Sequence, residues 1–172
     1  MEEKKIKLYN MAFPIWLLWL IPITWFIILP VNFFIDLLVV VLTMKYLKIK
    51  NIKTLVKPVI LRIWIFGFIA DMIGTVLMII PCLIQFDYNS QIGMWWYHNL
   101  SNAIMYNPFE SVYAFTWVTV SLIISAYCIY YFNSKICLKK VELSLIQKKK
   151  IALSLAVFTS PYAFYLPTAM FF

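Results

Sequence analysis

Charged residues are scarce in this chain of 172 residues: they make up 13% of it, whereas hydrophobic residues make up 64%. Soluble domains have about 25% charged and about 45–50% apolar residues. The shortage of charge and the long apolar runs exclude an ordinary soluble domain and leave no room for a separate one. The composition predicts an all-α, polytopic integral membrane protein.

Glycine and histidine are also rare, with three glycines and one histidine. The sequence contains no P-loop, no glycine-rich nucleotide fingerprint, no HExxH motif and no GxSxG motif. Asp36 and Asp71 supply the two acids that an aspartyl intramembrane protease needs, but neither lies in the glycine-containing motifs on which such enzymes rely. We therefore do not expect an enzyme.

The residues that bind metals or form disulfides are few and scattered. Cys82, Cys128 and Cys137 show no CxxC spacing and fall at different predicted depths, so we expect no disulfide and no metal site. His98 is the only histidine and lies in a predicted loop without a nearby acid, a poor setting for metal binding or catalysis. We expect no cofactor.

An almost wholly apolar stretch covers residues 11–46, with lysines on both sides of it. One straight helix of this length would be roughly 50 Å long at about 1.5 Å per residue, but a bilayer core is about 30 Å thick. One crossing would also separate the lysine clusters, although short cytoplasmic flanks collect Lys and Arg. We predict a helical hairpin that crosses over 11–28 and 29–46, with a proline-assisted turn at 29–32. The alternative is four spans with a re-entrant or long kinked first helix.

The whole chain, 1–172, is predicted to be one transmembrane domain with five crossings and a cytoplasmic N-terminus. The predicted spans are 11–28, 29–46, 58–85, 108–132 and 151–170, joined by basic cytoplasmic loops at 47–57 and 133–150 and an outer loop at 86–107. All 15 Lys and Arg residues then fall in or beside cytoplasmic segments, and the outer loop has none.

Two further features bear on location. The first apolar stretch is too long for a secretory signal and no small-residue cleavage site follows it, so we expect it to be part of the protein. The frequent use of Lys, Ile and Asn favours a bacterial origin. We therefore expect a multi-pass protein of the bacterial inner (cytoplasmic) membrane.

Two acids, Asp36 and Asp71, lie inside predicted spans. A charged Asp at mid-membrane costs about 2.5–3.5 kcal/mol on insertion scales, so each should face protein or a water-filled cavity. Counted from the predicted turn, Asp36 lies roughly 9 Å below the outer end of its span. Asn32 shares the helix face of Asp36, and Thr75 shares that of Asp71. These four residues form a candidate ion or substrate pathway; alternatively, each acid bonds a neighbouring helix and only fixes packing.

Other residues suit packing or lipid contact. Gly67 and Gly74 share a face of the span 58–85, where small residues let helices approach closely. The net charge of +8 arises from residues that flank spans, so we expect anionic headgroups and no nucleic acid as partners. The residues expected at the lipid headgroups are Arg62, Lys57, Lys139 and Lys140.

Two functions remain open at this point. The first is a small ion- or proton-linked channel or carrier for a small solute, working through the intramembrane carboxylates, since discontinuous helices mark binding sites in transporters. The second is a non-catalytic anchor or accessory subunit of a larger membrane complex, docked through the basic loops. Five short spans enclose little space, so we expect a homo-oligomer or a partner membrane subunit.

Overall fold

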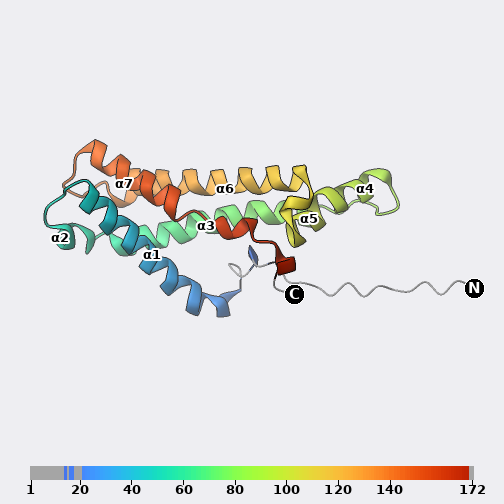
Figure 1. Cartoon of the computed structure of the whole chain (residues 1–172), viewed down its shortest axis with the longest axis horizontal. Helices are drawn as coiled ribbons and strands as arrows, with labels where there is room; N and C mark the ends of the chain where they lie inside the picture. Colours follow the sequence, from blue (N-terminus) through green and yellow to red (C-terminus); the bar gives the residue numbers. More distant parts are fainter. Residues whose placement is uncertain (1–13, 15, 18–20, 171–172) are drawn as a thin grey trace, which may run out of the picture.

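The computed structural model describes residues 14, 16–17 and 21–170, and over these residues the chain is helical without a strand. The α-helices are α1 (Trp25–Tyr46), α2 (Ile52–Val56), α3 (Ile60–Leu83), α4 (Gln91–Trp96), α5 (Asn102–Tyr106), α6 (Val112–Phe132) and α7 (Leu145–Phe158). α3 and α6 lie along the long axis of the molecule, α1 and α7 run obliquely to it, and the short helices lie toward its ends (Figure 1).

Three segments of the described chain are long and apolar enough to cross a membrane, namely Pro22–Tyr46, Ile60–Leu83 and Val112–Cys137, which suggests a membrane protein. The 24 residues of α3 span about 36 Å at about 1.5 Å per residue, enough for a hydrocarbon core of about 30 Å. In α3, 39% of the apolar stretch is buried, against 28% in α6 and 11% in α1. α3 is therefore the central helix and α1 a peripheral one. Five crossings are not confirmed.

The turn expected at 29–32 is absent, because α1 continues through these residues without a break. Pro30 removes one backbone N–H, but its ring lies on an exposed side of the helix, and membrane helices tolerate proline where neighbours bond the freed groups. The indole N–H of Trp64 donates to the adjacent Leu29 carbonyl at 2.8 Å. The predicted helical hairpin is therefore replaced by one helix from residue 25 onward.

Upstream of α1, much of the predicted span 11–28 lies outside the described residues. The described part contains 3₁₀ turns at residues 16–17 and at Pro22–Thr24 before α1. Trp16 is fully enclosed, and its indole N–H donates to the Ile104 carbonyl in α5 at 3.1 Å. This contact ties the start of the described chain to the end of the molecule that carries α4 and α5.

The predicted span 108–132 begins later than expected. Asn107 accepts a hydrogen bond from the Phe109 N–H and also donates its side-chain amide to Glu110, as a capping residue does. This motif organises a separate 3₁₀ turn, Pro108–Glu110, and α6 starts only at Val112 after an extended Ser111. A helical turn therefore begins at residue 108, as predicted, but α6 itself begins four residues later.

The helix found in place of the last predicted span, 151–170, begins and ends earlier than predicted. Ser144 and Gln147 form a capping box, in which each side chain bonds the other's backbone, so α7 starts at Leu145. The helix stops at Phe158, and only 3₁₀ turns follow it, at Tyr162–Tyr165 and Thr168–Met170. The α-helix thus ends before Pro161 and does not continue beyond it.

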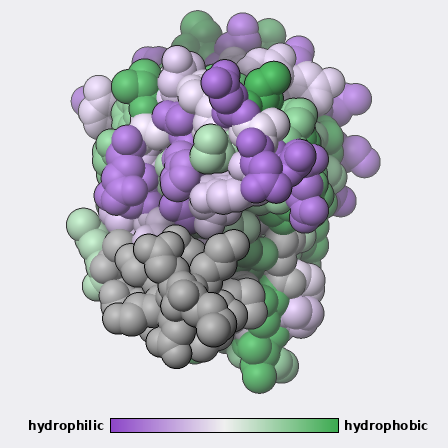
Figure 2. Space-filling view, turned by 90° about the vertical axis from the view of Figure 1, so that its right-hand side faces the viewer, coloured by the Kyte–Doolittle hydropathy of each residue, from purple (hydrophilic) through white to green (hydrophobic). Residues whose placement is uncertain are grey.

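The two ends of the molecule differ in charge. The end of α1, α2, the segment after α6 and the start of α7 meet at one end (Figure 1), and most of the described lysines belong to these segments. At the opposite end, α4 and α5 lie in the stretch 86–107, which has no Lys or Arg. Figure 2 looks onto this second end and shows hydrophilic residues gathered over it, with hydrophobic residues at its margins.

Two apolar cores fill the interior, one toward each end. The first contains Ile63 and Ala70 of α3 and Ile129 of α6. The second contains Met78 of α3 and Val118 of α6. Four buried polar residues lie between them along α3 and α6, so a polar layer separates the cores on these two helices. Its members on α3 and α6 are Asp71, Thr75, Ser121 and Ser125.

Candidate functional site

Asp36 and Asp71 both lie half-way along their helices. Asp36 is eleven residues from the start of the 22-residue α1, and Asp71 is eleven residues from the start of the 24-residue α3. Each is therefore about 17 Å from the start of its helix at about 1.5 Å per residue. The expected depth of Asp36 was too shallow, because it was counted from a turn that does not exist.

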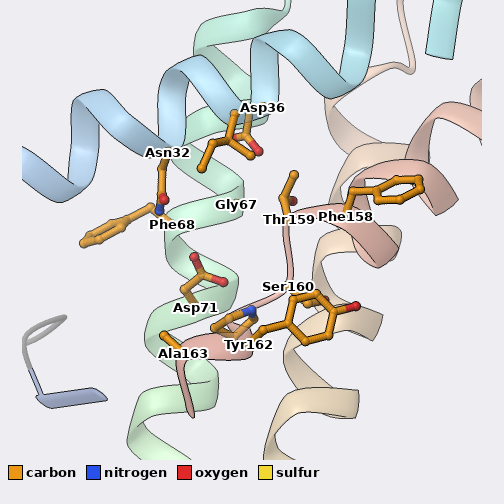
Figure 3. A pocket seen from close by; sticks show the side chains of 12 residues that line it. Asn32, Asp36, Gly67, Phe68, Asp71, Phe158, Thr159, Ser160, Tyr162 and Ala163 are labelled. Atoms are coloured by element: carbon orange, nitrogen blue, oxygen red, sulfur yellow. The ribbon is translucent and has the colours of Figure 1, made fainter. Parts of the chain in front are cut away.

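One cavity of about 200 Å³ brings these acids together (Figure 3). Three parts of the chain line it: the middle of α1, the middle of α3 and the segment that follows α7. The volume exceeds that of several water molecules, each of which occupies about 30 Å³ in the liquid. Its polar lining side chains are Asn32, Asp36, Asp71, Thr159, Ser160 and Tyr162.

The segment after α7 forms the third wall of the cavity because α7 ends at Phe158, beside the middle of α1 and α3. Pro161 has no N–H, so the Val157 carbonyl four residues earlier loses its helical donor; the Tyr162 hydroxyl donates to it instead. The Ser160 hydroxyl donates to the Ala156 carbonyl. The carbonyl that proline leaves open is therefore bonded by Tyr162, and the hydroxyl of Ser160 bonds the preceding one.

Hydroxyl groups lie against both carboxyl groups and also bond the backbone. The Thr159 hydroxyl lies against Asp36 and donates to a carbonyl one turn back, at 2.8 Å. The Ser125 hydroxyl of α6 lies against Asp71 and donates to the Ala70 carbonyl at 3.0 Å. A hydroxyl has one proton and two lone pairs, so each of these protons is shared between a carbonyl and a carboxyl group.

One carboxyl oxygen of Asp71 lacks a hydrogen bond. Its exposed fraction is 4%, and its Oδ1 has no hydrogen-bond partner among the described residues. Figure 3 shows its carboxyl group directed into the cavity. A buried polar atom without a partner is uncommon in native structures and calls for an explanation, such as an unseen water or ion.

The electrostatic character of the cavity is negative. Two carboxyl groups line it, and no Lys, Arg or His does so among the described residues. The C-terminal end of α7 adds to this potential, because a helix carries a partial negative charge at its C-terminus. The arrangement favours a positively charged occupant and disfavours an anion.

The two glycines predicted to serve packing have different neighbours. A Cβ at Gly74 would lie 2.8 Å from a Phe164 ring carbon and 3.0 Å from the Ser125 Cβ, so only glycine fits this seam. A Cβ at Gly67 would lie 3.4 Å from the Asp36 Oδ2, an ordinary contact. Gly74 is therefore a packing residue, and Gly67 leaves room at the cavity wall.

The remaining predicted residues lie outside the cavity. Thr75 is buried, does not line the cavity, and donates its hydroxyl to the Asp71 backbone carbonyl at 2.9 Å. His98 is exposed beside Tyr88 and Tyr97. The residues assigned to lipid headgroups are all exposed, namely Arg62, Lys57, Lys139 and Lys140.

Sequence reasoning assigned no site role to Thr159 and Ser160, which complete the cavity. The signal was present, since Thr159-Ser160-Pro161 ends a helical pattern in the middle of an apolar segment, where hydroxyl residues and proline mark a helix stop. Ser125 was placed on a stripe of its own helix, but its position against α3 depends on tertiary packing.

No protein-family model, curated protein or solved structure matches this chain. The geometry of the cavity is thus the basis on which a function can be inferred.

Proposed function

We propose that the protein is a small membrane carrier or channel that moves a cation or a proton through the carboxyl pair Asp36 and Asp71. The observation that supports this most strongly is the convergence of two mid-helix acids, from α1 and α3, on one cavity. Acids inside a membrane are costly and mark ion or proton pathways by default. Asn32, which lines the same cavity, completes the proposed path.

The proposed orientation places the basic end in the cytoplasm of a bacterial cell and the end with α4 and α5 outside, because short cytoplasmic segments collect Lys and Arg. The three apolar helices would then cross with both acids near the bilayer midplane. The interrupted segment that starts with α7 lines the same cavity and is proposed to be a further, broken crossing. The fifth crossing, upstream of α1, stays a prediction.

The broken crossing supports transport in particular. In many transporters the binding site lies where helices are interrupted at mid-membrane, because the helix ends supply oriented dipoles and free backbone groups. Here α7 ends beside both acids (Figure 3). A single cavity of about 200 Å³ is a binding site and not an open pore, so alternating exposure of this site is the proposed mode of transport.

Flux measured in liposomes tests the proposal. The full chain is reconstituted, and proton and alkali-cation flux are followed with internal dyes in the wild type, Asp36→Asn, Asp71→Asn and Glu142→Gln. Glu142 is exposed and outside the cavity, so its variant controls for loss of a carboxyl group as such. We expect flux in the wild type and in Glu142→Gln, and loss of flux in both cavity variants. Equal flux in all four proteins would remove the carboxylate mechanism.

A second function is favoured by the surface of α1. Only 11% of its apolar stretch is buried, and large side chains such as Phe26 and Phe34 are exposed at 83% and 66%. A second copy or another membrane subunit can cover this face, as in an anchor or accessory subunit. Purification in mild detergent distinguishes the two: a stoichiometric partner supports the accessory role, and a homo-oligomer supports the carrier.

A further inference from the structure

We propose that the cavity binds a small monovalent metal cation, such as Na⁺, with the Asp71 carboxylate as its principal ligand. The inference rests on the proposed function and makes it more specific, because it names the ion that the carboxyl pair handles. It is based on which oxygen atoms around the cavity have hydrogen-bond partners and which do not.

The first step is the unpartnered Oδ1 of Asp71. This residue is exposed at 4%, its carboxyl group points into the cavity, and Oδ1 has no hydrogen-bond partner among the described residues. An acid that only fixed packing would be expected to accept hydrogen bonds from its neighbours. The hydroxyl groups nearest the two acids, Thr159 at Asp36 and Ser125 at Asp71, also bond backbone carbonyls, and neither is a hydrogen-bond partner of the Asp71 Oδ1.

The second step is the set of oxygen atoms in the cavity lining. The hydroxyl oxygen of Thr159 and the amide oxygen of Asn32 lie in the same lining as the two acids and can each offer a lone pair to an occupant. Carboxylate, hydroxyl and amide oxygens that converge on one cavity are the ligands that hard cations prefer. The C-terminal end of α7 adds a partial negative charge at the same point.

The third step is the charge of the ion. Ca²⁺ takes about 6–8 oxygen ligands, and Mg²⁺ demands near-ideal octahedral geometry. The cavity has two acids, and no group of three or more His, Cys, Asp or Glu residues suited to a metal occurs in the described chain. In the proposed bound state Asp36 is protonated, so the single Asp71 carboxylate balances one monovalent cation. Half-helix ends and unwound carbonyls also coordinate Na⁺ in known transporter architectures.

Equilibrium binding of radioactive Na⁺ to the full chain in detergent tests the inference without any transport step. We expect saturable binding that Li⁺ or excess Na⁺ displaces and that choline does not, because methyl groups shield the charge of choline from oxygen ligands. Outer-shell changes alone cost about 10–100-fold in metal affinity, so loss of a direct ligand in Asp71→Asn should weaken binding by at least about tenfold. Glu142→Gln should bind as the wild type does.

A pair of threonine variants separates an oxygen ligand from a structural role. Thr159→Val removes the hydroxyl oxygen at nearly constant volume, and Thr159→Ser keeps it. Thr116 donates to a carbonyl one turn back in the same way but is exposed on α6, so Thr116→Val is the matched control. We expect weaker Na⁺ binding in Thr159→Val only, with melting temperatures measured in parallel to show that all variants fold.

The outcomes are distinguishable from those of the flux experiment. Absence of saturable Na⁺ binding, or binding that Asp71→Asn leaves unchanged, overturns the cation site even if proton flux still depends on both acids. Na⁺ binding that depends on Asp71 in a protein without flux supports the site and removes the transport function.

Discussion

The two faces of α3 are packed in opposite ways. Toward α6 the seam is dry and close: Gly74 admits no side chain beyond hydrogen, and the Trp117 indole N–H donates across it to the Leu77 carbonyl at 2.9 Å. Toward α1 the seam opens into the cavity at Gly67 and Asp71. The difference teaches that α3 is closely packed against α6, whereas α1 and the segment after α7 border the cavity.

Chemical labelling gives the largest contrast between the two faces. In a protein whose native Cys82, Cys128 and Cys137 are replaced by alanine, a cysteine is introduced by Thr159→Cys on the cavity side or by Ser125→Cys in the dry seam. Thr159 is half-buried and Ser125 is fully enclosed. We expect a small water-soluble thiol reagent to modify the first protein and not the second, as measured by mass spectrometry. Equal modification of both would mean that the α3–α6 seam is not dry.

Stability should respond strongly to a methyl group in the dry seam. Gly74→Ala forces the Phe164 ring and Ser125 to move, because the added Cβ would lie at 2.8 and 3.0 Å from them. Overpacking of this kind costs about 1–3 kcal/mol. The free energy of unfolding, measured by SDS titration in mixed micelles, should fall by that amount.

Gly67→Ala is the matched control for this prediction. Its added Cβ meets only the Asp36 Oδ2, at 3.4 Å, so the loss should be clearly smaller. A larger loss at Gly67 than at Gly74 would reverse the assignment of the two faces.

The hydrogen bond from Ser125 to the Ala70 carbonyl joins α6 to α3 at 3.0 Å. Ser125→Ala removes it, and interhelical bonds of this type in membranes average about 0.6 kcal/mol, with a maximum of about 1.7 kcal/mol. Ser121→Ala is the comparison, because the Ser121 hydroxyl bonds a carbonyl of its own helix. We expect a fall in unfolding free energy for Ser125→Ala and a smaller one for Ser121→Ala.

The smallest effect is expected where α1 meets α3. Trp64→Phe removes the indole donor to the Leu29 carbonyl, a bond at 2.8 Å on a half-buried side chain. A typical hydrogen bond contributes about 0.5–1.5 kcal/mol net, and we expect the low end of this range. Hydrogen exchange should nevertheless quicken over the first turns of α1 and stay unchanged in α6. Faster exchange in α6 would show that the two seams are coupled.

The sequence supports much of the candidate site. Asp36, Asp71 and Asn32 were selected because they are polar residues in apolar spans, and the structure brings all three into one cavity. The centre of α3 was also predictable, since its small and polar residues recur at helical spacing. Thr75 was selected by the same spacing but points its hydroxyl at its own backbone, which periodicity alone does not reveal.

The path of the chain around the site was harder to predict. Pro30 was interpreted as a turn because proline lacks an N–H, but it lies in the first turns of α1, where the missing N–H leaves only the Phe26 carbonyl without its helical donor, and α1 continues. At Pro161 the helix ends instead, and the Tyr162 hydroxyl bonds the carbonyl that proline leaves open. The sequence alone does not show which of these two outcomes a proline in an apolar segment will have.

The C-terminal segment is anchored on both sides of its interruption. Upstream, the capping box at Ser144 and Gln147 fixes the start of α7. Downstream, the Thr168 hydroxyl donates to the Met105 carbonyl at 2.8 Å. A segment that is anchored at both ends and interrupted between them can change shape only at the interruption, so any backbone rotation near Pro161 would shift Thr159 while the two anchored ends stay in place.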